Sequence, residues 1–159
     1  MIDKNKAIIE YLLQCNSIKD SPLYFNFINA RDEDKQIITL TNDVEMSRPF
    51  IDGSVMRQYL FTLLDFKSVS DNPLVTGVGY SNENVEEMAD VQALIDWVKE
   101  QNDLHNYPDF GSDCIVEQIE PTSDNPKLEG VNTDVAPMLA MYSVTIRVRY
   151  LDNSKVLWR

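Results

Sequence analysis

The stretch YSVTIRVRYL, residues 142–151, predicts a β-strand that has one buried face. Apolar and polar side chains alternate along it, and a period of two is typical of a half-buried strand. Its polar positions are Ser143, Thr145, Arg147 and Arg149, which are expected to face solvent. A strand with one packed face and one wet face belongs in an antiparallel sheet more often than in a parallel one.

A second long strand is predicted at Ser54–Val69. Over its middle, bulky residues point to both sides: Tyr59, Phe61 and Leu63 to one side, and Leu60, Leu64 and Phe66 to the other. A strand that is covered on both faces lies in the centre of a sheet. Shorter strands are predicted from their β-branched residues at Gln36–Thr41 and Cys114–Glu120. The aromatic segment Leu23–Ala30 could be a half-buried strand or an irregular aromatic hook.

Two amphipathic helices are predicted outside these strands. Residues Lys4–Cys15 carry an apolar stripe at helical spacing, and Asn16-Ser17 is predicted to end that helix. A longer helix follows a cap at Ser81 or Asn82 and ends near Asn102. Its first turns are acidic, as the positive end of the helix dipole favours, and three of these acids are predicted to be solvated: Glu86, Glu87 and Asp90.

The remaining segments are predicted to be loops, because turn-forming residues replace any regular period. They are Asn42–Gly53, Asp71–Gly79 and Pro121–Pro137, the last of which carries three prolines. Long loops in a small protein usually have a functional role.

The order of the elements is a helix, several strands, a long helix and two more strands. This order lacks the repeated strand–helix–strand alternation that produces a parallel sheet. We therefore predict an α+β fold, with a mainly antiparallel sheet covered on one side by the N-terminal helix and the long central helix. At 159 residues the chain fits a single domain, residues 1–159, from which residues 152–159 could extend as a C-terminal tail.

The composition is that of a folded protein outside the membrane. Apolar residues make up 43% of the chain, and no apolar run approaches the roughly 20 residues that cross a bilayer. Cys15 and Cys114 lack metal-ligand spacing, so we interpret them as reduced core residues of a cytoplasmic protein. The net charge of −12 argues against a protein that grips nucleic-acid phosphates.

No cluster of residues predicts catalysis or a bound cofactor. The single histidine, His105, has no nucleophile motif beside it, and Gly77-Val78-Gly79 lacks the further glycine and the lysine of a phosphate-binding loop. Asp103, His105 and Asp109 could be assembled into a metal site, but a solvated loop after the helix is the stronger interpretation. We predict no enzyme activity, no cofactor and no metal.

Several side chains are candidates for contacts with other proteins. Arg147 and Arg149, on the wet face of a strand, could pair with carboxylates of a neighbouring copy or with their own sheet. Beyond the last strand, Leu157 and Trp158 could pack on their own domain or anchor a partner. The apolar residues of the long loops complete the set of interface candidates: Val75, Val78, Tyr80, Leu128 and Val131.

Four stretches carry a resemblance to a known family: KAIIEYL (6–12), FTLLDF (61–66), VQALIDW (91–97) and PMLAMYSVTI (137–146). By their order and spacing the chain resembles the minor capsid and tail-terminator, or tail-completion, proteins of tailed phages and prophages, which are encoded between head and tail-tube genes. The resemblance spans nearly the whole chain, and none of the four stretches is a chemical motif.

The resemblance implies an α+β sheet with helices on one side and a homo-oligomeric ring, typically a hexamer, that caps the tail tube and joins it to the head. The partners would be the tail tube protein and the head–tail connector proteins. An acidic lumen would let DNA pass without specific binding. The protein would be made in the bacterial cytoplasm and would reside at the head–tail junction of the virion. The family has no catalytic residues to carry over.

A different class of protein remains the alternative. The charge of −12 would also suit an acidic inhibitor or immunity-type protein that covers a basic protein partner.

Overall fold

The structure is a computed structural model that describes residues 3–19, 23–26, 35–46, 48–70, 75–76, 79–80 and 83–156. For residues 19, 35–45, 75, 76, 79, 80 and 83 it describes the backbone alone.

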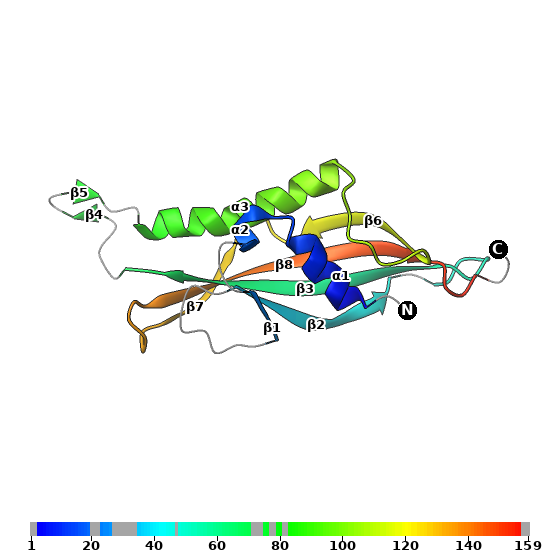
Figure 1. Ribbon diagram of the computed structural model, residues 1–159, viewed down its shortest axis with the longest axis horizontal. Helices are drawn as coiled ribbons and strands as arrows, with labels where there is room; N and C mark the ends of the chain where they lie inside the picture. The colour runs from blue at the N-terminus through cyan, green and yellow to red at the C-terminus, as the bar shows by residue number, and fades with distance from the viewer. Residues whose placement is uncertain are drawn as a thin grey trace.

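A six-stranded sheet runs along the length of the molecule (Figure 1). Its strands are β1 (Leu23–Phe25), β2 (Lys35–Glu45), β3 (Val55–Ser68), β6 (Cys114–Pro121), β7 (Lys127–Asn132) and β8 (Leu139–Asp152). Their order is β1-β2-β3-β8-β6, and β7 also pairs with β8. Only β1 and β2 are parallel to each other within this described sheet, so the predicted α+β class with a mainly antiparallel sheet is confirmed.

β8 is the strand on which the sheet is organised. It pairs with β3 from Val55↔Asp152 to Ser68↔Leu139. Along its other edge, β6 pairs with the second half of β8 and β7 with the first half. The predicted central position of β3 is confirmed, because β3 lies between β2 and β8.

The helices are α1 (Lys4–Leu12), α2 (Asn16–Lys19) and α3 (Glu83–Asp103). Asp3 caps α1, and its carboxylate accepts hydrogen bonds from the backbone N–H groups of Asn5 and Lys6. The predicted end of the first helix was wrong, since α1 stops at Leu12 and Asn16 begins the short α2 instead. The bounds predicted for the long helix are confirmed by α3. Of the three acids predicted to be solvated, Glu86 and Asp90 are exposed, whereas Glu87 is half-buried.

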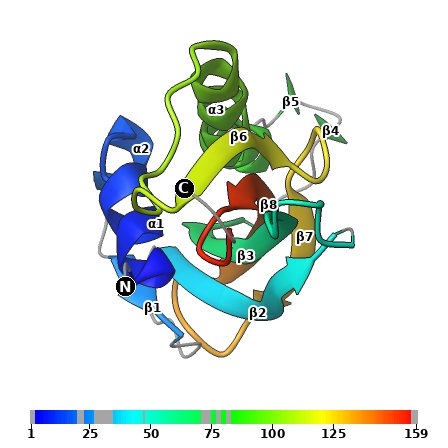
Figure 2. The ribbon, with the colours of Figure 1, turned by 90° about the vertical axis from the view of Figure 1, so that its right-hand side faces the viewer.

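One hydrophobic core contains residues from all three helices and from alternate positions of the central strands. The helical members are Ala7, Ile8, Tyr11, Leu12, Ile18, Val91, Leu94, Ile95 and Val98. The members from β3 and β8 are Tyr59, Phe61, Leu63, Ala140, Tyr142, Val144, Ile146, Val148 and Tyr150. Figure 2 shows the strong curvature of the sheet, with α1 lying against one side of the curve. Cys15 also belongs to this core, as predicted.

The opposite face of the sheet is less wet than predicted. Leu64 and Phe66 are buried there and pack with Met141. Along β8, Ser143 is buried, and the other polar positions, Thr145 and the two arginines, are half-buried. The sequence pattern identified the two faces correctly but overestimated the exposure of the polar one, because neighbouring strands shield side chains on a curved sheet.

Three of the predicted loops contain strands, and in two of them the strand belongs to the six-stranded sheet. β2 continues to Glu45, with a register shift between Thr39 and Asp43, so the predicted loop Asn42–Gly53 begins too early. β7 lies inside the predicted loop Pro121–Pro137. In both cases pairing with a longer neighbouring strand outweighs the weak local propensity of the segment. A further two-stranded hairpin, β4 (Val75–Thr76) and β5 (Gly79–Tyr80), lies in the segment before α3.

Candidate functional site

β7 presents a free edge and exposed side chains to solvent. One edge pairs with β8, and within the described part of the chain no strand pairs with the other edge. All 6 residues of β7 are exposed, and the side chains of Leu128 and Val131 are apolar, with 52% and 47% of their surface accessible. A free edge offers its N–H and C=O groups to any approaching strand, and most sheets blunt or cover it. β7 is therefore a candidate site for pairing with a partner.

Polar contacts hold β7 in place beside β8. The Ser143 hydroxyl donates a hydrogen bond of 2.6 Å to the carboxylate of Glu129, which sits at a bulge in β7. Lys127 Nζ lies 3.7 Å from the same carboxylate. A methyl group built at Gly130 would meet no atom within 4 Å, so the space beside the backbone is open.

The turn between β2 and β3 carries two further exposed apolar side chains. Phe50 is 51% exposed and Ile51 is 95% exposed. These two residues were not predicted as contact residues, because apolar residues inside a predicted loop show no periodicity. The available signal was an apolar pair flanked by Pro49 and by Asp52-Gly53, which is typical of a tight turn that presents its tip to solvent.

This turn is well fixed by hydrogen bonds. Phe50 N–H donates to the Ser54 carbonyl over 2.7 Å, and Gly53 N–H donates to the Phe50 carbonyl over 2.9 Å. Hydrogen bonds from the Ser54 hydroxyl and N–H hold the pKa of the Asp52 carboxyl below its ordinary value. Gly53 has φ +92°, and a side chain there would clash with the carbonyl oxygen of Lys155. Phe50 and Ile51 are thus held out on a defined turn.

Arg147 and Arg149 share one face of β8 but have different surroundings. Arg147 forms an ion pair with Glu120 of β6, and Gln118 Nε2 donates to the other carboxylate oxygen of Glu120 over 2.9 Å. Arg149 has no hydrogen-bond or ion-pair partner among the described residues, and its Nε atom is buried. Of the two alternatives left open by the sequence, Arg147 therefore takes the contact within its own sheet.

A bulge in β6 explains this difference. The register is Val116↔Tyr150 and then Gln118↔Arg149, so Glu117 has no partner on β8. Without the extra residue, Glu117 would lie opposite Arg149. The bulge instead places an amide opposite Arg149 and leaves Glu117 exposed.

The Arg147→Glu variant is expected to lower the free energy of unfolding by about 1 kcal/mol, because two carboxylates would then lie side by side. The loss should stay small, since the side chains of Arg147 and Glu120 are 39% and 29% exposed and water screens their charges. Urea unfolding of Arg147→Glu, Glu120→Arg and the double exchange checks this. The double exchange should recover most of the loss, and equal losses in all three variants would contradict the pairing.

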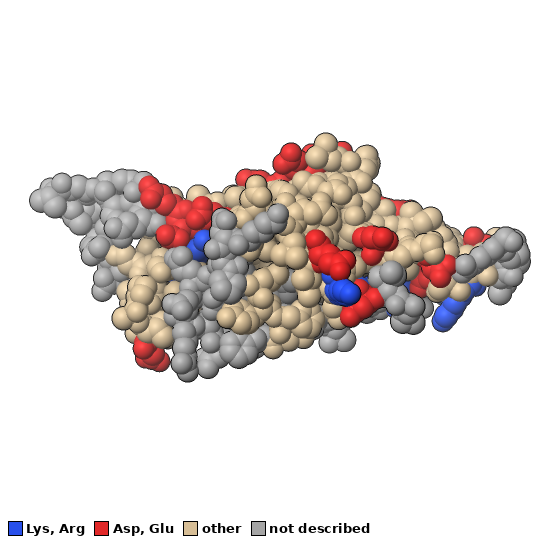
Figure 3. Space-filling model, viewed as in Figure 1, with Lys and Arg blue, Asp and Glu red and all other residues tan. Residues whose placement is uncertain are grey.

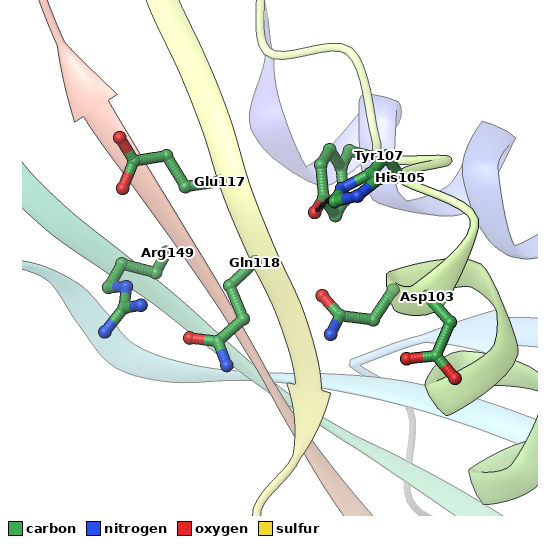
Figure 4. Close-up of a pocket in the computed structure, with 7 residues that line it drawn as sticks. Asp103, His105, Tyr107, Glu117, Gln118 and Arg149 are labelled. Carbon is green, nitrogen blue, oxygen red and sulfur yellow. Dashed lines mark hydrogen bonds between the residues drawn. The ribbon is translucent and has the colours of Figure 1, made fainter.

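A hollow of about 380 Å³ lies between β6 and the segment that follows α3 (Figure 4). Its lining residues come from three separate parts of the chain: Asn102, Asp103, His105, Tyr107, Glu117, Gln118 and Arg149. The lining is mostly polar and includes groups of both charges. Asp103, His105 and Arg149 were predicted separately as candidate residues, and no sequence pattern indicates that they line one hollow.

Hydrogen bonds fix the wall of the hollow formed by residues 102–107. The side-chain oxygen of Asn102 accepts from Ile119 N–H over 3.1 Å, which ties the end of α3 to β6. The Tyr11 hydroxyl donates to the Asn106 carbonyl over 2.8 Å, and burial raises the pKa of that phenol, so it keeps its proton. The wall is therefore supported from α1 as well as from β6.

α3 ends in a turn in which a histidine occupies a glycine position. Asn106 N–H donates to the Gln101 carbonyl over 2.9 Å, and His105 N–H donates to the Asn102 carbonyl over 3.2 Å. This pair of bonds defines a Schellman motif, whose left-handed residue is usually glycine. His105 has φ 55° there, and its Nδ1 lies 2.9 Å from the Tyr107 hydroxyl. The left-handed backbone makes this position strained for any residue with a side chain.

The His105→Gly variant is expected to have a free energy of unfolding about 1 kcal/mol higher than His105→Ala, because only glycine adopts the left-handed conformation without strain. Both variants lose the imidazole, so their difference isolates the backbone term. Thermal unfolding of the pair measures it. Equal midpoints would mean that the left-handed turn is not kept in solution.

The residues of the metal-site hypothesis are only partly brought together. Asp103 and His105 line the hollow, but Asp109 does not, and its carboxylate accepts from Gly111 N–H over 2.9 Å. Among the residues that the structure describes, no three His, Cys, Asp or Glu side chains are grouped so as to hold a metal ion.

The other interface candidates fall largely outside the described side chains. Val78, Leu157 and Trp158 lie outside the described residues. Val75 pairs with Tyr80 across the β4–β5 hairpin, where only the backbone is described. Of the loop residues named from the sequence, Leu128 and Val131 are thus the two whose exposure is established.

Acidic groups are spread over the face of the molecule shown in Figure 3. Some are paired: Lys67 Nζ lies 3.6 Å from the Asp90 carboxylate, and Lys99 Nζ lies 2.7 Å from that of Asp124. The hydrogen bond from Lys99 holds the pKa of Asp124 below its ordinary value. The Lys99–Asp124 pair is exposed and contributes little to stability.

Neither a known protein family nor a curated protein matches this sequence. In the described part of the chain, no helix is long and apolar enough to span a bilayer. The functional proposals therefore depend on the residues themselves.

Proposed function

We propose that this chain is a structural virion protein that self-associates into a ring at the head–tail junction of a tailed phage. The observation that carries the proposal is the free edge of β7, with Leu128 and Val131 exposed beside it. An edge of this kind promotes pairing with another chain, so a protein that must stay monomeric would be expected to blunt it.

The contrast with β6 supports β7 as the contact surface. β6 is also at an edge of the sheet, but the end of α3 lies along it, and Asn102 satisfies the outward N–H of Ile119. β7 has no comparable cover among the described residues. A closed ring requires the open edge of β7 to meet a different surface of the next copy, because pairing of β7 with β7 would give a two-fold dimer.

The position in the virion is proposed from the sequence resemblance. The α+β fold is compatible with it, and the net charge of −12 suits a channel through which DNA slides without being held. We assign the tail tube protein and the head–tail connector proteins as partners. The apolar turn at Phe50 and Ile51 is a second surface suited to such a contact.

Mass measured by light scattering tests the proposal. Over a wide range of protein concentration, with and without magnesium, the expected result is a closed multiple of the 18.3 kDa subunit. Purified tail tubes mixed with the protein should acquire it at one end, as seen by electron microscopy. A protein that stays monomeric at every concentration and does not bind tail tubes would refute the proposed function.

The acidic inhibitor or immunity-type protein is the competing proposal, supported by the same charge of −12. Charge-driven binding to a basic partner weakens steeply with salt, whereas pairing through strands and apolar residues does not. A pull-down at low and high salt separates the two. A salt-sensitive basic protein as the main captured species, without self-association, would favour the inhibitor.

A further inference from the structure

The hollow beside β6 is lined by Arg149, which forms no ion pair with a described residue. The Arg149 side chain is half-buried, its Nε atom is buried, and it has no acceptor among the described residues. A guanidinium carries five N–H donors, and leaving a buried one unsatisfied is unfavourable. The Nη groups of Arg149 are not buried in this way, so they are the donors that an acceptor from outside the described chain can meet.

The neighbouring acids do not meet this need. Glu120 is occupied by Arg147 on one carboxylate oxygen and by Gln118 on the other. The bulge takes Glu117 out of register with β8, and Figure 4 shows its carboxylate and the Arg149 guanidinium pointing in different directions. The pairing of β6 with β8 thus satisfies one arginine and leaves the next one without a carboxylate opposite it.

A second donor lies in the same hollow. The side-chain oxygen of Asn102 is taken by Ile119 N–H, which leaves its NH₂ group without an acceptor in the described residues. Because the hydrogen bond fixes which end of the amide carries the oxygen, the NH₂ group is the end available to a ligand.

We propose that this hollow binds a carboxylate group, with Arg149 as the residue that holds it. The guanidinium fork matches a carboxylate with two parallel hydrogen bonds. A phosphate would match the same fork, so inorganic phosphate is the competing ligand that the test includes.

The carboxylate could come from a free small acid or from an acidic side chain of a second copy of this chain, which carries 26 acidic residues. The site does not depend on the ring at the head–tail junction, since either source would occupy it. The two sources predict different behaviour as ligand and protein concentrations are varied separately.

NMR detection of the arginine Nε–H groups provides the test. The protein is titrated with sodium succinate, with the neutral succinamide, and with inorganic phosphate, and its spectrum is also followed over protein concentration without additive. Saturable movement of the Arg149 signal with succinate but not succinamide supports the site with a free acid. Movement with protein concentration alone supports it with a second copy as the source.

The variants Arg149→Met and Arg149→Lys complete the test, with Lys155→Met as a control at an exposed lysine. Arg149→Met should weaken succinate binding at least about tenfold, Arg149→Lys should retain part of it, and the control should bind normally. The melting temperature of Arg149→Met should not fall, which separates a ligand-binding arginine from one that only supports the sheet.

Three results would overturn the proposal. The first is an Arg149 signal that moves with neither succinate nor protein concentration, which would mean that water satisfies the donors. The second is tighter binding of phosphate than of succinate, which would refute the ligand class. The third is succinate binding that survives Arg149→Met, which would place the acid elsewhere.

Discussion

The Leu128→Lys, Val131→Lys double variant is expected to self-associate about a hundredfold more weakly than the parent protein. Burying an apolar side chain of this size contributes about 1.5–3 kcal/mol, so losing two contacts amounts to a hundredfold or more. Lysine on an edge strand also opposes pairing with a second strand. The dissociation constant, measured by light scattering or sedimentation over protein concentration, checks the expectation.

The matched control is Val85→Lys on α3, because Val85 is 52% exposed, as is Leu128. It adds one lysine, against two in the double variant, at an apolar surface position away from β7, and its association should stay within a few-fold of the parent. Neither variant should shift the urea midpoint, since all three side chains are exposed. Equal weakening in both variants would show that charge alone, and not the β7 edge, controls association.

The Phe61→Ala variant is expected to lose about 3–5 kcal/mol of unfolding free energy, a large share of the stability of a domain this size. Phe61 is fully buried on β3, with Ile146 beside it on β8, and it belongs to the core that joins the sheet to the helices. Removing the ring leaves a cavity that a paired central strand cannot close. Urea unfolding followed by circular dichroism measures the loss.

Two comparisons make that measurement specific. Phe61→Leu keeps most of the volume and should cost much less than Phe61→Ala. Ile51→Ala removes an apolar side chain that is 95% exposed and should leave stability almost unchanged. A loss below about 1 kcal/mol for Phe61→Ala would contradict the central position of β3 in a single core.

The elements that could be predicted from the sequence are those whose hydrophobic pattern shows which of their faces is buried. β3 and β8 alternate because one face of each packs on the core, and α3 carries an apolar stripe for the same reason. β7 has no such hydrophobic pattern, since all its residues are exposed and it contains Gly130. It forms because β8 extends beyond the end of β6 and its backbone groups need partners, which is a property of the neighbour and not of the segment.

The candidate site was harder to predict, because strand register decides it. Arg147 and Arg149 are equivalent in the pattern of the last strand, yet one has an acid opposite and the other an amide. This difference between Arg147 and Arg149 arises from one extra residue in β6, which no local sequence pattern indicates. The hollow itself joins residues of α3, β6 and β8, so its composition could be read only after the fold was known.

The central position of β8 also governs the moment at which the chain can fold during synthesis. β8 emerges from the ribosome after each of the strands with which it pairs. Until residues 139–152 are available, β3 has β2 alone beside it, and β6 has no strand partner among the described residues. The nascent chain thus carries the apolar face of an incomplete sheet, which is the kind of surface that chaperones recognise. Stalled translation before residue 139 should yield a protease-sensitive chain, and completion of β8 should make it resistant in one step.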